Sequence, residues 1–160
     1  LQTNLPDAPI HPEFPMYSGF LNATSDGNSS LFYILVEAIR VDPSTAPLLV
    51  WFNGGPGGSS LAGFFLEHGP FRVTGTDGVL TYNEFTWNQY ANVLYLESPL
   101  GVGFSQTNEE NYTEDDETAA DNSFYALQDF MTRVHPNYAQ RDYYLSGQSY
   151  VGAYIPWLSR

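Results

Sequence analysis

The 160-residue sequence contains no cysteine, few basic side chains and no long hydrophobic run. The absence of cysteine excludes disulfides, thiolate metal ligands and thiol nucleophiles, and it leaves the redox compartment undetermined. Five Lys and Arg residues oppose eighteen Asp and Glu residues, so the formal net charge is −13. This balance argues against nucleic acid as a partner, because a phosphate backbone is bound by clustered cations. It suits a protein kept soluble in an acidic medium, although a generic acidic surface explains the charge equally well.

No stretch approaches the roughly 18 consecutive apolar residues of a membrane span, so we expect no membrane partner. No N-terminal segment resembles a signal peptide, and we expect any leader to have been removed already. Aromatic residues are abundant instead, at 16% with 12 Tyr and 11 Phe. The length and this aromatic content suffice for one domain with a real core.

Three Asn-X-Ser/Thr sequons begin at Asn22, Asn28 and Asn111. The first two lie in a polar, turn-like stretch and the third lies in an acidic loop, so each is in a setting where a glycan would be exposed. A single sequon is a common chance pattern, but the three together favour a secreted glycoprotein.

Apolar patterns and turn residues predict five strands, at 16–23, 31–41, 48–52, 91–97 and 142–146. Helices are predicted at 61–67, 118–134 and 150–158. The first two strands are expected to form an antiparallel hairpin, and the later alternation of strand and helix predicts a mostly parallel sheet with helices on its faces. Residues 1–15, with proline at every third position from Pro6, are predicted to form an extended arm.

The helix predicted at 118–134 is amphipathic, and His135-Pro136 is expected to end it. Its apolar face is predicted to consist of Phe124, Leu127, Phe130, Met131 and Val134.

Two glycine-bearing loops follow predicted strands. The first, at 53–60, reads Asn-Gly-Gly-Pro-Gly-Gly-Ser-Ser, and its glycines leave the backbone free to adopt positive φ and to expose N–H groups. A phosphate-binding loop would require a lysine, which is absent, whereas a flexible loop remains open as an alternative. The second, at 98–105, reads Ser-Pro-Leu-Gly-Val-Gly-Phe-Ser.

The segment Gly147-Gln148-Ser149-Tyr150-Val151-Gly152 joins the last predicted strand to the last predicted helix. A sharp turn of this kind lifts a serine Oγ clear of the sheet in α/β-hydrolases and leaves the next backbone N–H free to bind an oxyanion. The usual second glycine would fall at Val151, one place earlier than Gly152. Taken alone, the segment is also compatible with an ordinary strand-to-helix turn.

Together, residues 51–60, 97–105 and 147–152 closely resemble the serine carboxypeptidase family of α/β-hydrolases. Residues 17–20 and 31–33 resemble that family's opening hairpin, so the resemblance spans nearly the whole chain. It implies an α/β fold in which residues 1–160 form the N-terminal portion of a single domain. The mixed, mostly parallel sheet of that portion would be flanked by helices and incomplete without further chain. It also implies removal of C-terminal amino acids from peptides at acid pH, in vacuoles, lysosomes or secretions, with no cofactor and no metal.

Carried over by position, the resemblance makes Ser149 the nucleophile and the backbone N–H groups of Gly55 and Tyr150 the oxyanion hole. The positions that match the family's site for the substrate's free carboxylate are Asn53, the N–H of Gly54, Glu67 and Gln148. In the family two acidic side chains meet at this site and share protons, which favours binding of a carboxylate in acid.

Two positions depart from the family's pattern. Gln148 stands where the family usually has Glu, and an amide donates hydrogen bonds at any pH. We therefore hypothesise that carboxylate binding extends to higher pH than is usual for the family, or that the chemistry has moved towards an acyltransferase or lyase. Gly58 stands where many members have cysteine, which removes a disulfide and says little about chemistry.

A serine nucleophile needs a general base and an orienting carboxylate, which α/β-hydrolases supply in the order Ser, Asp, His. Eleven residues follow Ser149 and none of them is Asp or His, while His11, His68 and His135 all precede it. We interpret His68 and His135 as helix-end residues. The chain alone is therefore expected to lack a complete triad, and to need the remainder of the same enzyme or a second chain.

The parallel sheet should also be unfinished, with a hydrophobic edge that another polypeptide covers. A homodimer and a non-catalytic, truncated relative that keeps the fold both remain open as alternatives.

Overall fold

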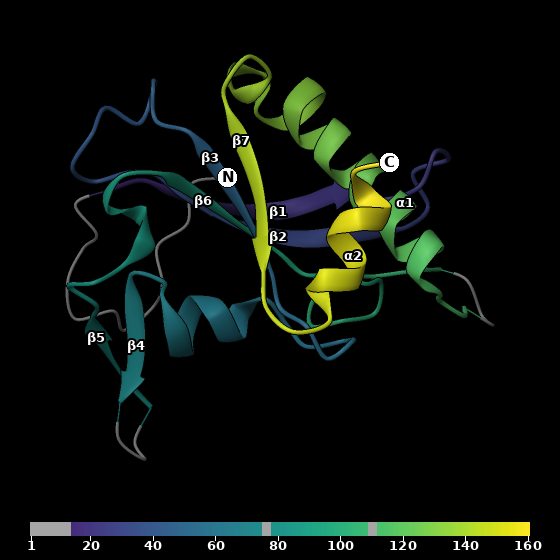
Figure 1. Ribbon diagram of the computed structural model, residues 1–160, viewed down its shortest axis with the longest axis horizontal. Coiled ribbons are helices and arrows are strands. Elements are labelled where there is room, and N and C mark those ends of the chain that lie inside the picture. The colour runs from purple at the N-terminus through teal and green to yellow at the C-terminus, as the bar shows by residue number, and fades with distance from the viewer. Residues whose placement is uncertain (1–13, 75–77, 109–111) are drawn as a thin grey trace.

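A computed structural model describes residues 14–74, 78–108 and 112–160 (Figure 1). Most of the predicted proline-rich arm, His11 and the sequon at Asn111 lie outside the described residues.

The central feature is a five-stranded sheet with the order β1-β2-β6-β3-β7. Its strands are β1 (Met16–Asn22), β2 (Ser30–Val36), β3 (Leu48–Phe52), β6 (Asn92–Leu96) and β7 (Tyr143–Gly147). β2 pairs antiparallel with β1 and β6, whereas β3 pairs parallel with β6 and β7. Only β2 therefore runs against the other four strands, which confirms the predicted mixed, mostly parallel sheet. The second predicted strand ends at Val36 and does not reach residue 41.

Both faces of the sheet are buried, because β2, β3 and β6 are almost continuously apolar. Leu31, Tyr33 and Leu35 of β2 point into one core. Ile34 and Val36 point into the other core.

Helices cover the first of these cores. They are α1 (Asp116–Asp129), its π-helical continuation η3 (Phe130–Val134) and α2 (Val151–Leu158). The carboxylate of Asp115 caps α1 by accepting a hydrogen bond from the Thr118 N–H at 2.8 Å. His135 ends η3, as predicted, and a short 3₁₀ turn, η4 (Pro136–Tyr138), follows it.

The predicted apolar face of the 118–134 helix is wrong at Phe124, whose exposed fraction is 52%. The buried stripe instead contains Ala119, Ser123, Ala126 and Leu127. Small side chains on this stripe let the helix axis approach the sheet closely, so the helix turns its bulkier Phe124 outwards.

The second core is covered by η1 (Gly63–Glu67), which is wound as a π-helix within the helix predicted at 61–67. An antiparallel hairpin of β4 (Phe71–Thr74) and β5 (Val79–Tyr82) follows it, and a 3₁₀ turn, η2 (Trp87–Gln89), lies beyond the hairpin. The sequence did not predict this hairpin, because only Phe71 of its two strands is buried.

β7 lies at one end of the sheet order, and among the described residues no strand pairs with its outer side. The side chains of Tyr143 and Tyr144 on this strand are 52% and 58% exposed. This agrees with the expectation of an apolar, unfinished edge.

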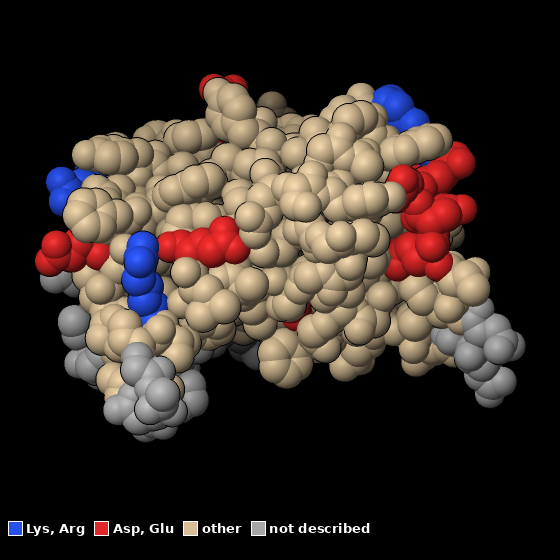
Figure 2. Space-filling model, turned by 60° about the horizontal axis from the view of Figure 1, so that its bottom comes forward, with Lys and Arg blue, Asp and Glu red and all other residues tan. Residues whose placement is uncertain are grey.

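Charged side chains are sparse on the face shown in Figure 2, where acidic groups gather in a few separate clusters. Among residues 14–74, 78–108 and 112–160, no helix combines the length and the apolar character needed to cross a membrane.

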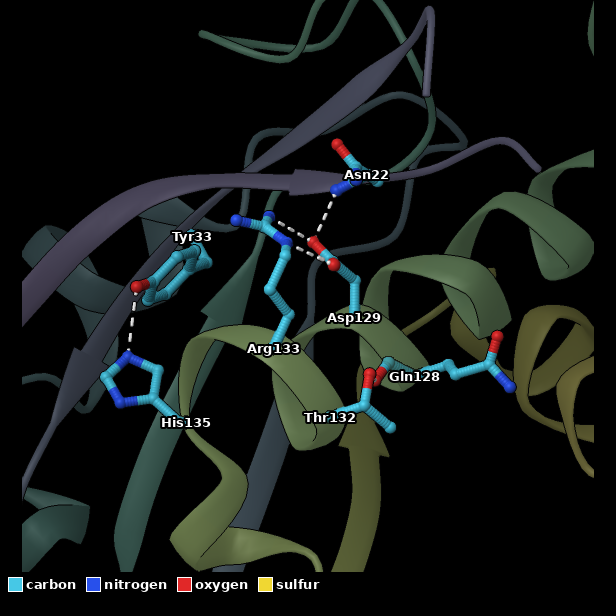
Figure 3. A network of polar contacts seen from close by, with 7 residues as sticks. All are labelled: Asn22, Tyr33, Gln128, Asp129, Thr132, Arg133 and His135. Carbon is cyan, nitrogen blue, oxygen red and sulfur yellow. Dashed lines mark hydrogen bonds and ion pairs between the residues drawn. The ribbon is translucent and has the colours of Figure 1, made fainter. Parts of the chain in front are cut away.

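Asp129 joins the end of α1 to the end of β1 (Figure 3). Its carboxylate accepts the backbone N–H of Asn22 at 2.8 Å and hydrogen bonds from two guanidinium nitrogens of Arg133. Burial alone would raise the pKa of Asp129, but the hydrogen bonds from Arg133 and Asn22 outweigh burial and lower the pKa below its ordinary value of 3.8.

Asp129→Asn removes this charged acceptor and is expected to lower the free energy of unfolding by about 1 kcal/mol at pH 7. Because the pKa is depressed by folding, the contribution is fully present above the unfolded-state pKa and disappears as pH falls through the folded-state pKa. Urea unfolding of both proteins at pH 7 and at pH 2.5 measures the difference. Asp121→Asn, on an exposed pair with Arg160, is the control and should have little effect at either pH. An equal loss at both pH values for Asp129→Asn would contradict the assignment.

Candidate active site

Ser149 occupies a strained turn between β7 and α2. Its φ is +57°, and it is the only non-glycine residue with positive φ among those the structure describes. Few non-glycine residues adopt this left-handed conformation, and such strain concentrates at functional sites. The side chain is exposed, as expected for a serine raised above the end of a strand.

The turn needs glycine at Gly147 but not at Gly152. A Cβ on Gly147 would lie 2.4 Å from Cγ1 of Val151 and 2.5 Å from the carbonyl oxygen of Phe52, whereas a Cβ on Gly152 would meet nothing within 4 Å. Val151 is buried and fills the space beneath the turn. Packing therefore does not require the glycine at position 152, which stands one place after the usual second glycine of the sequence pattern.

The first glycine loop packs directly against this turn. A Cβ on Gly54 would lie 2.6 Å from the carbonyl oxygen of Gln148 and 2.9 Å from Cβ of Ser149 and from the backbone nitrogen of Tyr150. Gly55 has a φ of +126°, which favours glycine. Neither the Gly55 N–H nor the Tyr150 N–H donates a hydrogen bond to any described residue. The structure thus brings the loop that carries Gly55 against Ser149 and Tyr150 and leaves both predicted oxyanion donors available.

The four residues predicted to bind a carboxylate also come together. Oε1 of Glu67 accepts hydrogen bonds from Nε2 of Gln148 at 2.8 Å and from Nδ2 of Asn53 at 3.4 Å. Gly54, which follows Asn53, touches the Gln148 backbone as described above. Donors from the loop after β3 and from the turn at residues 147–150 (the elbow) therefore flank the acidic side chain of Glu67 at the end of η1. Their role in binding substrate stays a prediction.

Trp51 belongs to this cluster, although the sequence reasoning did not select it. Its indole N–H donates to Oδ1 of Asn53 at 2.7 Å, and the backbone N–H of Gly63 donates to the same oxygen at 3.1 Å. These two donors fix the orientation of the Asn53 amide, so that its NH₂ group faces Glu67. The position of Trp51, two residues before Asn53 on a predicted strand, was the available signal, because alternate strand residues share a face.

Both described histidines contact groups other than Ser149. The ring of His68 stacks on Trp87 with centroids 3.9 Å apart, and its Nδ1 lies 3.2 Å from the Tyr95 hydroxyl. Burial lowers the pKa of His68 to about 4. Nε2 of His135 lies 3.0 Å from the Tyr33 hydroxyl, and burial lowers the pKa of His135 as well. Both residues end helices, as predicted, and the general base is not found among the described residues.

Two of the three sequons lie within the described residues, at the turn between β1 and β2. Asn22 and Asn28 are both exposed. Nδ2 of Asn28 donates to Asp26 at 2.7 Å, and the hydroxyl of Thr24, the third residue of the first sequon, donates to the same carboxylate at 2.6 Å. Glycan occupancy at these positions stays a prediction.

The sheet order, the strained serine after β7 and the glycine loop after β3 define an α/β-hydrolase fold. The chain belongs to the serine carboxypeptidase family, whose family model matches residues 6–160. It is 48% identical over 159 residues to serine carboxypeptidase ctsa-3.1 of Caenorhabditis elegans, covering 98% of this chain and 27% of that protein. It is 44% identical over 155 residues to the lysosomal protective protein of Mus musculus, covering 97% of this chain and 32% of that protein.

The fold also matches a solved structure. The crystal structure of Kex1Δp, a prohormone-processing carboxypeptidase from Saccharomyces cerevisiae, superposes with a TM-score of 0.79 at 30% identity. The match covers 91% of this chain and 33% of that chain. The chain thus spans about a third or less of the length of these relatives.

The packing around Gly147 and Gly152 predicts opposite effects of the same substitution at these two positions. Gly147→Ala places a methyl group into Val151 and the Phe52 carbonyl, so it is expected to lower the free energy of unfolding by about 2–3 kcal/mol. Gly152→Ala, in the first turn of α2, should be neutral or stabilise by up to about 1 kcal/mol, because alanine is the better helix former. Urea unfolding midpoints of the two variants provide the comparison. Equal midpoints would show that the backbone at Gly147 is not as closely packed as described.

Proposed function

We propose that this chain carries the acylation site of a serine carboxypeptidase, which releases C-terminal amino acids from peptides. The observation that carries the proposal is the strained Ser149 held against the Gly54–Gly55 turn, beside the Glu67–Gln148–Asn53 cluster. A nucleophile, two free N–H donors and a site for a free carboxylate lie within one small region. This is the set of groups that an exopeptidase acting through an acyl-enzyme requires.

In this mechanism Ser149 Oγ attacks the carbonyl carbon of the last peptide bond. The backbone N–H groups of Gly55 and Tyr150 donate to the oxyanion that forms, and each such donor typically contributes about 3 kcal/mol to lowering the barrier. The C-terminal amino acid leaves as its peptide bond breaks, and water then hydrolyses the ester on Ser149. The His that moves the protons and the Asp that orients this His come from polypeptide outside this chain.

Asn53, Gly54 and Gln148 supply hydrogen-bond donors to the substrate's terminal carboxylate. Glu67 lies within the same cluster, and its carboxylate would repel that of the substrate unless the two share a proton. Binding is therefore expected to strengthen in acid.

The open edge at β7 supports covering by that further polypeptide, either the remainder of the same enzyme or a second chain. A homodimer stays an alternative. The mouse relative is named for the lysosome and the yeast relative for prohormone processing. These names support a secreted, vacuolar or lysosomal location, as do the sequons at Asn22 and Asn28, and glycans at Asn22, Asn28 and Asn111 belong to the same proposal.

Gln148 favours a second candidate function. The family usually carries an acid at this position, and its loss weakens the link between carboxylate recognition and acid pH. A serine carboxypeptidase-like acyltransferase or lyase would keep Ser149 and its oxyanion hole without needing an acid pair.

Labelling with a fluorophosphonate tests the nucleophile, using the protein with whatever polypeptide co-purifies. Ser149→Ala should abolish labelling and the release of amino acids from an N-blocked dipeptide. Ser146→Ala is the matched control, because Ser146 lies on β7 with its hydroxyl bonded to the Val50 carbonyl at 2.8 Å, and it should keep both activities. Labelling without amino-acid release would favour acyl transfer or lyase chemistry. Labelling that persists in Ser149→Ala would refute the assignment.

The pH profile of kcat/KM tests the role of Gln148. Gln148→Glu introduces a second acid beside Glu67, so the basic limb should move to lower pH, with about a tenfold loss near pH 7 and little change in acid. Glu67→Gln, the complementary variant, removes the remaining acid and should extend the basic limb upwards. If the pH profiles of kcat/KM for the wild type and Gln148→Glu are superimposable, the hypothesis that Gln148 extends carboxylate binding to higher pH is refuted.

A further inference from the structure

Glu97 is a fully buried acidic residue that the mechanism above does not use. It follows β6 directly, its exposed fraction is 0%, and it forms no ion pair with a described Lys or Arg residue. Burying a carboxyl group is costly unless hydrogen bonds compensate for the lost water. An acid at this position therefore needs an explanation beyond filling space.

The carboxyl group of Glu97 joins the two glycine-bearing loops. Oε1 accepts a hydrogen bond from the Ser59 hydroxyl in the first loop, and Oε2 accepts the backbone N–H of Phe104 in the second at 2.8 Å. Gly103 lies against the same group: its φ is +57°, and a Cβ there would overlap both carboxyl oxygens. The two loops thus close over a single side chain, and each of its oxygens bonds a different loop.

From Ser59 the connection continues towards the oxyanion hole. The next residue, Ser60, donates its hydroxyl to the Leu96 carbonyl at 2.6 Å and accepts the Asn53 N–H at 3.1 Å. The Gly58 N–H donates to the Gly54 carbonyl at 2.8 Å and closes the turn that contains Gly55. Both ends of the turn are therefore tied to the end of β6.

We propose that Glu97 is a positioning residue for the oxyanion hole: through Ser59 it fixes the turn that presents the Gly55 N–H to the reacting carbonyl. The inference rests on the proposed function, because it assigns Gly55 its role in stabilising the oxyanion. Glu97 itself touches neither Ser149 nor, in this proposal, the substrate. If Glu97 had a purely structural role, its hydrogen bond to the loop that contains Phe104 would be sufficient. The bond between Glu97 and Ser59 would then not affect kcat.

A double-mutant cycle on kinetics distinguishes these roles. Ser59→Ala removes the hydroxyl that bonds Glu97 with little change in volume, and Glu97→Gln keeps the shape but no longer offers two acceptor oxygens. Each variant is expected to lower kcat at least tenfold and leave KM within about twofold, because oxyanion donors act mainly in the transition state. The double variant should lose no more than the larger single loss, since both act on one turn.

Ser29→Ala is the matched control. Ser29 is also buried, and its hydroxyl donates to the Thr107 hydroxyl at 3.0 Å, outside the first glycine loop. The kcat of Ser29→Ala should equal that of the wild type. Unchanged kcat in Ser59→Ala, or multiplicative losses in the double variant, would overturn the proposal.

Hydrogen exchange separates this inference from the proposed function. In Ser59→Ala and in Glu97→Gln, the amides of residues 53–60 should exchange at least tenfold faster, while those of β1 and β2 stay unchanged. This measurement needs no catalytic activity. Unchanged exchange at 53–60 would refute the role of Glu97 even if Ser149 labels normally. Faster exchange in a protein whose Ser149 does not label would support the positioning and refute the proposed function alone.

Discussion

The contact on which the site depends is the close backbone packing of β3 and β7 at their carboxyl ends. The two strands pair in parallel from Leu48 and Tyr143 to Phe52 and Gly147. The pairing ends where the backbone after each strand turns away from the sheet. Beyond that point, Gly54 lies against the backbone of Gln148 and Tyr150. Only glycine allows two backbones to approach so closely. The proposed nucleophile, one proposed oxyanion donor and the proposed carboxylate-binding cluster all take their positions from this contact.

A second constraint comes from β6, which lies on the other side of β3. The end of this strand holds the first glycine loop through Ser60 and Glu97, while the elbow holds it from the opposite side. The loop is therefore fixed between two neighbouring strands. In the proposed mechanism, this preorganisation allows backbone N–H groups to act on a developing charge without reorganising during the reaction.

Much of this arrangement could be predicted from local sequence patterns. The run Leu48–Phe52 is continuously apolar, which predicts a central strand buried on both faces, and the glycines after it indicate where the strand ends. A strand, a glycine and a helix flank Ser149 in order, which made it a candidate, and the resemblance of three separate segments to one family made it the predicted nucleophile. These features can be predicted from the sequence because each depends on residues that are close together in it.

Other features depend on contacts between segments that are distant in the sequence, so local patterns could not predict them. The β4–β5 hairpin buries little apolar surface, so it gives no strong alternation. Phe124 was placed on the wrong face because alanines, which carry little hydrophobic signal, form the buried stripe of α1. Glu97 looks like an ordinary strand-end acid, and only the fold shows that Ser59, Gly103 and Phe104 enclose it.

Ser149, Gly55 and Tyr150 are proposed to form one acylation site. A crystal structure of the protein, with its co-purifying polypeptide, after reaction with a peptidyl phosphonate tests this most directly. We expect phosphorus bonded to Ser149 Oγ, with one phosphonyl oxygen roughly 2.7–3.1 Å from the backbone nitrogens of Gly55 and Tyr150. Phosphorus bonded to another residue, or a phosphonyl oxygen directed away from both nitrogens, would contradict it.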